Sequence, residues 1–219
     1  MDADFAELIG VILGDGNLSN PKNHYRVGIT GDPVKDKEYF EYLQNLIKRV
    51  WNKDVPVYHR GRGLRIVINS KSAFSTLVFE YKLPVGDGKS YKVIIPDAIA
   101  DNWELAKHAI RGIVDTDGSI FLADKPGSPN YPSIEISTNS PDLAYQLKGI
   151  LDQKGFRVAN IWQSYSKNNA GPSFKVALNG TAQVRKWMEE IGFSNPRKRR
   201  VAEMALAIAK ISSAVAASH

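Results

Sequence analysis

The chain contains no cysteine, which excludes disulfide bonds and cysteine-ligated zinc. Only four histidines are present, and their positions do not have the spacing of a metal-binding set. No serine or cysteine nucleophile signature is found either. These absences remove the common hydrolase and zinc-site classes, and they leave carboxylates as the candidate catalytic groups.

Long apolar runs are also missing. The alanine-rich segment 201–218 is interrupted by Glu203 and Lys210, so it predicts an amphipathic helix instead of a membrane span. The first residues lack a basic region followed by an apolar run, so no signal peptide is expected. We therefore expect an intracellular protein, cytoplasmic or organellar, that is neither secreted nor attached to a membrane.

Positive charge is in moderate excess. The 219 residues include 29 lysines and arginines against 23 acids, and the formal net charge is +6. A basic balance favours a polyanionic partner such as nucleic acid, although basic proteins of other classes exist. At 43% hydrophobic residues the chain can build a substantial core.

Two nine-residue segments of the chain match each other. Residues 8–16 read Leu-Ile-Gly-Val-Ile-Leu-Gly-Asp-Gly, and residues 110–118 read Ile-Arg-Gly-Ile-Val-Asp-Thr-Asp-Gly. Each is an apolar segment with an early glycine, a small residue four positions later, and then Asp-Gly. Two copies about a hundred residues apart, each followed by similar elements, indicate an internal repeat.

The small residues predict two closely packed helices. Gly10 and Gly14 lie on one helical face, as do Gly112 and Thr116, and this spacing allows two backbones to approach closely. Gly16 and Gly118 are expected to end the helices in the left-handed conformation. Asp15 and Asp117 would then lie side by side, where two carboxylates repel each other unless a cation lies between them. Hard oxygen ligands of this kind suit Mg²⁺.

The remaining pattern repeats around these two helices. Alternating strand patterns, glycine-containing hairpins and amphipathic helical patterns give the order helix, two strands, helix, two strands, helix in each half. The predicted fold class is α+β: a pseudo-two-fold pair of αββαββα repeats, each with a four-stranded antiparallel, saddle-like sheet. Residues 1–100 and 101–219 form the two repeats of one compact unit, because no linker rich in glycine and serine separates them.

On these residues the chain resembles the LAGLIDADG homing endonucleases, in the form that carries both motifs in one polypeptide. The resemblance covers nearly the whole chain. It implies that Asp15 with the Gly14 carbonyl, and Asp117 with the Thr116 carbonyl, bind catalytic metal. The other interpretation of the two acids is a pair of helix caps, but aspartate at a helix C-terminus opposes the macrodipole.

The resemblance also implies further catalytic groups. Lys89 resembles the loop lysine that orders the attacking water, and Lys198 is its counterpart in the second half. Asn139 fills the place, at the end of the second strand, where the family often has glutamine. The first half departs from this pattern with Gly31-Asp32, so the two sites are expected to be unequal.

The free faces of the two sheets would contact DNA. Arginine reads guanine, asparagine and glutamine read adenine, and glutamate reads cytosine. The candidate residues are His24, Arg26, Thr30, Arg60, Arg62, Arg65 and Asn69 in the first half and Ser133, Glu135, Ser137, Arg157, Gln163, Lys175 and Asn179 in the second. The simpler interpretation is that a polar sheet face is only solvated.

The function implied is site-specific cleavage of double-stranded DNA by a monomer at a long asymmetric target, leaving short 3′ overhangs. Mg²⁺ is the expected cofactor, Mn²⁺ a substitute, and Ca²⁺ an ion that supports binding without cutting. An intron-encoded origin and intron RNA as a further partner belong to the same resemblance. Two alternatives stay open: a non-cutting RNA maturase or DNA-binding regulator on this scaffold, and a basic ligand-binding protein without a nucleic-acid partner.

Overall fold

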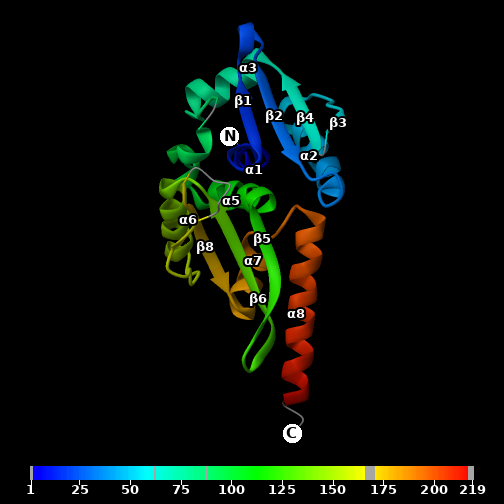
Figure 1. Ribbon diagram of the computed structural model, residues 1–219, viewed down its shortest axis with the longest axis vertical. Coiled ribbons are helices and arrows are strands. Elements are labelled where there is room, and N and C mark those ends of the chain that lie inside the picture. Colours follow the sequence, from blue (N-terminus) through cyan, green and yellow to red (C-terminus); the bar gives the residue numbers. More distant parts are fainter. Residues whose placement is uncertain (1, 62, 87, 166–170, 217–219) are drawn as a thin grey trace.

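The computed structural model describes residues 2–61, 63–86, 88–165 and 171–216. Two four-stranded antiparallel sheets lie on either side of a central pair of helices, α1 and α5 (Figure 1). In chain order the first half contains α1 (Ala3–Leu13), β1 (Gly16–Ser19), η1 (Pro21–Asn23), β2 (Arg26–Gly31), α2 (Lys37–Trp51), β3 (Val57–Arg60), β4 (Gly63–Asn69), α3 (Lys71–Ser75), the π-helical turn η2 (Thr76–Glu80), η3 (Lys89–Tyr91) and α4 (Asp97–Ala100). The second half contains α5 (Trp103–Asp117), β5 (Gly118–Lys125), β6 (Ser128–Thr138), α6 (Pro141–Gln153), β7 (Trp162–Ser164), β8 (Ser173–Asn179), α7 (Thr181–Glu190) and α8 (Pro196–Ala216).

The two sheets have the same topology and the same register. Their strand orders are β1-β2-β4-β3 and β5-β6-β8-β7. Gly16 pairs with Ile29 in the first sheet, and Gly118 pairs with Ile136 in the second. The predicted pair of αββαββα repeats is therefore confirmed, with α8 as an addition that the first half lacks.

Alternation along the strands separates a covered face from an open one. Ile66 and Ile68 are buried on β4, and Ile134 and Ile136 are buried on β6, as the sequence pattern predicts. Helix α2 covers the first sheet. Its apolar side chains recur at helical spacing, so they form one stripe, and this stripe is buried. The stripe consists of Tyr39, Phe40, Leu43, Leu46 and Ile47.

Side-chain caps begin several helices where the sequence places a short polar residue. Asp2 accepts a hydrogen bond from the Phe5 amide at 2.9 Å and so begins α1. Ser140 accepts from the Leu143 amide at 3.2 Å at the start of α6. These bonds satisfy backbone N–H groups that have no partner inside the helix.

Helices α1 and α5 pack closely because glycine lies at their contact. A methyl group added at Gly10 would lie 2.0 Å from the Ala109 carbonyl oxygen, and one added at Gly112 would lie 2.3 Å from the Glu7 carbonyl oxygen. Gly16 and Gly118, which begin β1 and β5, were expected to adopt the left-handed conformation, but the structure gives a different reason for glycine there. Gly118 is extended, with φ −89° and ψ 166°, and is not left-handed. Side chains at Gly16 and Gly118 would instead collide with the last turn of the preceding helix.

A buried polar network also joins the two halves. Glu7 on α1 is 0% exposed, and its carboxylate accepts from Tyr42 at 2.8 Å and from Arg111 Nε at 3.1 Å. Asp115, one turn after Arg111 on α5, has a different partner. Asp115 accepts instead from the Ser194 amide at 2.7 Å. Arg111 also donates to the Ile191 carbonyl, so both side chains reach the segment between α7 and α8 but make different hydrogen bonds there.

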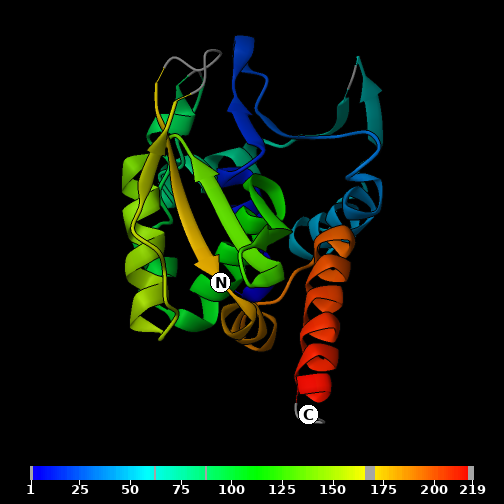
Figure 2. The same ribbon diagram turned by 60° about the horizontal axis from the view of Figure 1, so that its bottom comes forward.

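The sequence pattern does not define every bound: residues 125–132 form the end of the β5–β6 hairpin, and β7 has only three residues. Helix α8 runs along the outside of the second half, and its first turns contact α2 (Figure 2). Arg200 pairs with Glu38 at 2.8 Å across this contact. Among the described residues, no helix combines the length and the apolar character that crossing a bilayer requires.

Candidate metal and nucleic-acid site

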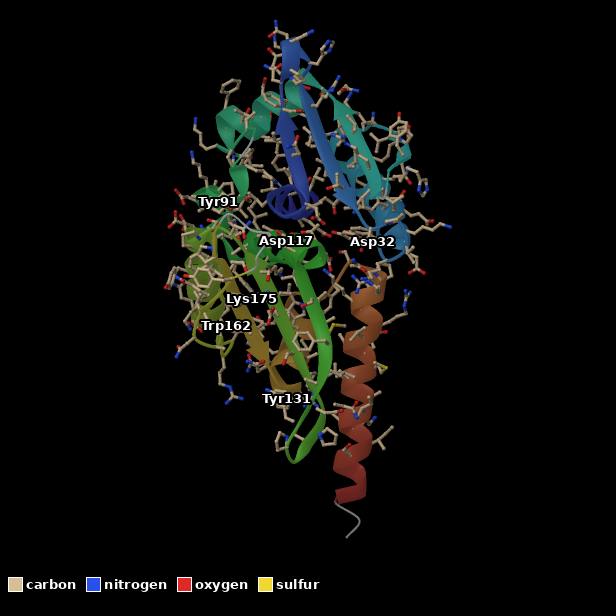
Figure 3. The ribbon with its side chains drawn as sticks, in the orientation of Figure 1. Asp32, Tyr91, Asp117, Tyr131, Trp162 and Lys175 are labelled. Atoms are coloured by element: carbon tan, nitrogen blue, oxygen red, sulfur yellow. The ribbon has the colours of Figure 1, made fainter. Side chains whose placement is uncertain are left out.

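Asp15 and Asp117 meet at the ends of the two central helices. Asp15 follows the last turn of α1, and Asp117 is the last residue of α5. A methyl group added at Gly14 would lie 3.4 Å from Asp117 Oδ2, so Asp117 faces the end of the opposite helix. Figure 3 shows Asp117 between the two sheets, with Lys175 next to it on the second sheet. The structure therefore brings together the two acids that the repeat predicts as partners.

The pKa values of both acids are raised, mainly by burial. Burial raises the pKa of Asp15 to about 7, and the nearby Asp117 and Asp36 carboxylates add to this shift. The Asp117 residue as a whole is exposed, but surrounding protein removes water from its carboxylate and raises its pKa to about 6. The positive charges of Lys89 and Lys198 oppose this shift. Two partly desolvated carboxylates with raised pKa values form a place where a divalent cation would be stabilised.

The donor set fits a hard divalent cation. Within the part of the chain that the structure describes, no hydrogen bond or ion pair holds the side chain of Asp15 or Asp117. No group of three or more His, Cys, Asp or Glu side chains among the described residues is arranged to hold a metal. A cation here would therefore use the two carboxylates, backbone carbonyls and water, which is a donor set that suits Mg²⁺.

The end of α1 lies beside the acid of the other repeat. The sequence paired Asp15 with Gly14 and Asp117 with Thr116, within one helix each. In the structure Gly14 and Asp117 line the same cavity, which places the carboxylate of one repeat beside the helix end of the other. The Gly14 and Thr116 carbonyls also accept from lysines, at 3.3 Å from Lys89 and 3.2 Å from Lys198.

Lys89 and Lys198 occupy equivalent places but have different freedom. Lys89 donates to the Ile12 carbonyl at 3.0 Å and to Gly14, so one of its three hydrogens remains. Lys198 is 2% exposed, and four carbonyls surround it at the end of α5. These belong to Val114 (2.6 Å), Asp115 (2.8 Å), Thr116 (3.2 Å) and Gly118 (2.6 Å). Burial lowers the pKa of Lys198 to about 8.

This difference assigns the two lysines different roles. An ammonium group has three hydrogens, so Lys198 has none left for a water molecule. Lys198 therefore holds the end of α5, and the expected water-ordering role fits Lys89 better. The sequence could not separate the two roles, because both lysines follow similar loops.

Asn139 directly follows the last residue of β6. Asn139 and Asp117 line one cavity of about 450 Å³ at the junction of the two halves. The other lining residues are Leu13, Gly14, Ser90, Val93, Ser137, Thr138, Ser164, Ser173 and Lys175. The cavity thus joins the end of α1, the loop after Lys89 and the open face of the second sheet.

Asp32, the first-half departure, is engaged locally. Its carboxylate accepts from the Val34 amide at 2.9 Å and the Lys35 amide at 2.8 Å, and these bonds lower its pKa. Figure 3 places Asp32 on the side of the first sheet, at a distance from Asp117. Asp36 also raises the pKa of Asp15, after burial and Asp117, and sequence reasoning missed it because it is the residue before α2 and not part of a strand.

The first sheet presents a polar open face. Register places Thr30 opposite Arg65, and Arg26 opposite Asn69, so these four candidates share one face. Thr30 also ties this face to the site, because its amide donates to the Asp15 carbonyl at 3.2 Å. His24 lies before β2, outside the strand. Arg60 is on β3 without a described side chain, and Arg62 lies outside the described residues.

The second sheet follows the same plan with one correction. Glu135, Ser137 and Lys175 share the open face, as do Ser133 and Asn179, which are hydrogen-bonded at 2.9 Å. In contrast, Trp162 pairs with Lys175, so Gln163 points to the opposite face and its assignment was off by one residue. Arg157 lies outside the strands.

The open faces of the two sheets also carry exposed aromatic side chains, which were not predicted from the sequence. Trp162 is 42% exposed beside Lys175, and Phe121 is 40% exposed opposite Ser133. Tyr58 is opposite Arg65 in the first sheet and is 52% exposed. The alternation in β5, with Ile120 buried and Phe121 exposed, was the signal that could have identified one of them.

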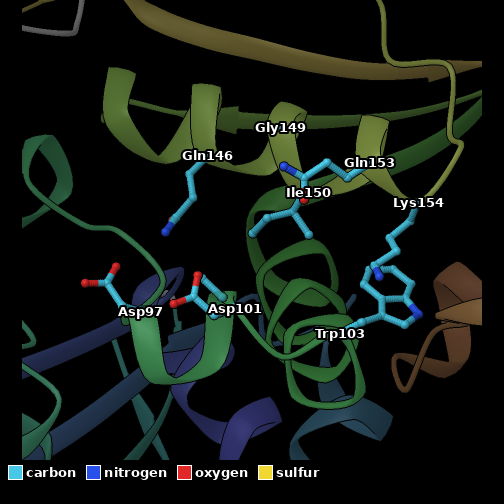
Figure 4. A pocket seen from close by; sticks show the side chains of 9 residues that line it. Asp97, Asp101, Trp103, Gln146, Gly149, Ile150, Gln153 and Lys154 are labelled. Atoms are coloured by element: carbon cyan, nitrogen blue, oxygen red, sulfur yellow. The ribbon is translucent and has the colours of Figure 1, made fainter.

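A second cavity, of about 380 Å³, lies between α4 and α6, away from Asp15 and Asp117 (Figure 4). Its polar groups hold neighbouring elements together. Gln146 bonds the Ile95 backbone in both directions, at 2.7 and 2.8 Å, and the Lys154 ammonium lies 5.6 Å from the centre of the Trp103 ring. We therefore assign this cavity no part in the candidate site.

Comparison with known proteins agrees with this geometry. Residues 104–192 match the model of the family described as LAGLIDADG-like domain. The family match therefore lies in the second half of the chain, and the whole chain has the fold of solved homing endonucleases. The homing endonuclease I-WcaI, solved bound to its DNA recognition sequence, superimposes with a TM-score of 0.62 at 16% identity, over 92% of this chain and 86% of that one.

Two further relatives extend the comparison. I-DmoI, solved in complex with DNA and Mn, gives a TM-score of 0.56 at 18% identity, over 88% of this chain and 97% of that one. In sequence, a replication factor C small subunit from Methanocaldococcus jannaschii is 29% identical over 89% of this chain. The chain spans only 10% of that relative's length, so the likeness concerns a small part of a much longer protein.

Proposed function

We propose that the chain is a site-specific endonuclease that cuts double-stranded DNA by metal-dependent hydrolysis of phosphodiester bonds. The observation that carries the proposal is the meeting of Asp15 and Asp117 at the point where the open faces of both sheets converge. The Thr30 amide, on the first sheet, donates to the Asp15 carbonyl. Lys175, on the open face of the second sheet, lines the same cavity as Asp117. DNA bound along both faces would therefore cross the two acids.

The chemistry follows from the groups at this crossing. Asp15 and Asp117 would hold Mg²⁺, or Mn²⁺ in its place, with the Gly14 and Thr116 carbonyls as further oxygen donors. Bound Mg²⁺ activates water and neutralises the leaving oxygen. Lys89 keeps one hydrogen with which to orient a water near Asp117, and Asn139 lines the same cavity. Lys198 maintains the end of α5 on which Asp117 stands.

The remaining details belong to the same proposal. Two acids at one crossing are consistent with one cut in each strand, which leaves short 3′ overhangs when the cuts lie across the minor groove. The open faces differ in sequence, so we expect a long, non-palindromic target that is read by a monomer. The relatives solved with DNA, Mn or Ca support DNA and a divalent ion as partners.

The test is a cleavage-site selection from a randomised duplex library with Mg²⁺, compared with Ca²⁺. Specific double-strand cuts in Mg²⁺, and binding alone in Ca²⁺, are expected. Binding without cutting in either ion would favour a non-cutting DNA regulator. Preference for a structured RNA over duplex would favour an RNA maturase, and binding of neither nucleic acid would favour a ligand-binding protein.

A further inference from the structure

An ion pair lies on the open face of the second sheet, at the edge of the Asp117 cavity. Lys175 Nζ is 2.9 Å from Glu135 Oε1, and Lys175 also donates to the Ser137 hydroxyl. The two charged side chains are on neighbouring strands, β8 and β6, and remain 21% and 23% exposed. The pair is therefore held in a fixed arrangement and is still open to a ligand.

The first half has a lone cation at the equivalent position. Thr30 pairs with Arg65 as Ser137 pairs with Lys175, so Gly28 corresponds to Glu135. The Arg65 guanidinium covers Gly28, with Nη2 3.5 Å from where a methyl group would lie. Among the described residues, no acid pairs with Arg65, and its Nε has no hydrogen-bond partner.

The pair keeps unused hydrogen-bonding capacity of both signs. A carboxylate has about four acceptor positions, and Lys175 occupies one of those on Glu135. Lys175 uses two of its three hydrogens, on Glu135 and Ser137. The face therefore presents an acceptor and a donor side by side in a fixed order.

In the major groove a C·G pair shows the complementary order, with the cytosine N4 amino donor beside the guanine O6 and N7 acceptors. We propose that Glu135 and Lys175 read one C·G base pair together. Glu135 accepts from cytosine N4, and Lys175 donates to guanine O6 or N7. The inference rests on the proposed function, and it adds to it a specific base pair and the residues that select it.

The structure also indicates where in the target this base pair lies. Lys175 and Ser137 share one cavity with Asp117, so the base pair lies close to the cut. At the equivalent place in the first half, Arg65 alone would select a guanine without reading its partner base. The two sides of the cut are therefore read differently.

The test is a binding-site selection with the full chain in Ca²⁺, from a duplex library randomised across the central base pairs. The wild type is expected to select C·G at one position next to the cut. Glu135→Gln keeps the shape but replaces one acceptor by a donor, so preference for cytosine there should fall on the order of tenfold. The double variant Glu135→Lys with Lys175→Glu retains the ion pair and should invert the preference to G·C.

A matched control is the double variant Lys186→Gln with Glu190→Gln. It removes a half-buried ion pair on α7, which packs against the covered face of the same sheet. Base preference should not change in this variant.

Two results would overturn the inference alone. One is a loss of affinity in the double variant that is uniform at every base pair, which would indicate phosphate contacts instead of base reading. The other is unchanged base preference in both Glu135 variants. Failure of the wild type to bind any duplex would overturn the proposed function together with this inference, so the two failures are distinguishable.

Discussion

Gly10 of α1 lies directly against Ala109 of α5, so closely that a methyl group on Gly10 would be 2.0 Å from the Ala109 carbonyl oxygen. Gly112 has the same relationship to Glu7 on the other side of the contact, at 2.3 Å. Backbone, and not a flexible side chain, fills the space in both cases. Because the acids stand at the ends of these helices, this contact fixes their separation.

Replacing Gly112 by alanine should therefore destabilise the protein. The added methyl group must push the helices apart, and overpacking of this kind costs about 1–3 kcal/mol. Chemical denaturation measures the change in the free energy of unfolding. Gly149→Ala is the control, because Gly149 lies within α6, is exposed and has no atom within 4 Å of the added carbon. That variant should gain up to about 1 kcal/mol from helix propensity. Equal effects in the two variants would contradict the close contact.

Asp15→Asn and Asp117→Asn should each retain DNA binding and lose double-strand cleavage. Asparagine keeps the size of the side chain but removes the charge that a cation needs. One strand should still be nicked when only one acid is changed. Strand-specific labelling of the target, with gel separation of nicked and linear products, measures this. Asp97→Asn, an exposed acid on α4, serves as the control. Cutting of both strands by both variants would show that the acids were wrongly assigned.

The stability of the metal-free protein should fall as pH rises from about 4 to about 7. The folded-state pKa values of Asp15 and Asp117, about 7 and about 6, lie above the ordinary value of 3.8. In this window the unfolded state loses its protons first, so ionisation favours unfolding. Below pH 4 both states are protonated, and the full stability is present. A divalent cation reverses the effect, because it favours the ionised carboxylates.

Thermal unfolding in Mg²⁺ and in chelator, at pH 5 and pH 8, measures this effect. The rise in Tm caused by Mg²⁺ should be larger at pH 8. The raised pKa of Asp115 contributes equally with and without metal, so the difference isolates the site. Asp15→Asn should lose most of the rise. A rise in Tm that is independent of pH and unchanged in this variant would place metal binding elsewhere.

Lys198→Met and Lys89→Met should have different consequences. Loss of Lys198 leaves buried carbonyls without a donor, so the free energy of unfolding should fall by roughly 1–3 kcal/mol or more. Lys89 holds only two carbonyls at the end of α1, and its loss should reduce the cleavage rate while the protein remains folded. Denaturation and single-turnover cleavage of both variants separate stability from rate. A folded Lys89→Met variant that cuts at the wild-type rate would remove Lys89 from the mechanism.

The repeat, the strand faces and the two acids could be predicted from sequence because each rests on local spacing. In each central helix, a glycine (Gly10 or Gly112) is followed four residues later by another small residue, and this spacing predicts the helix contact. The alternation that includes Ile66 and Ile68 predicts which face of their strand is buried. Gln163 shows the limit of that method. It belongs to a strand of three residues, and so short a segment contains too little alternation to define its register.

The roles of Lys89, Lys198 and Asp36 depend on contacts between distant segments. Lys198 meets the end of α5 across about eighty residues, and only the folded chain shows that its hydrogens are already used. Asp36 acts on Asp15 because the start of α2 returns to the centre of the molecule.

The sequence by itself determined that two helices carry a matched pair of acids within two equivalent repeats, because glycine spacing and strand alternation are written in neighbouring residues. Only the tertiary structure decided which lysine keeps a free hydrogen, that Asp36 lies near enough to Asp15 to raise its pKa, and that Glu135 and Lys175 form one unit. Hydrogen-bond capacity and charge pairing depend on distances between atoms that lie far apart along the chain.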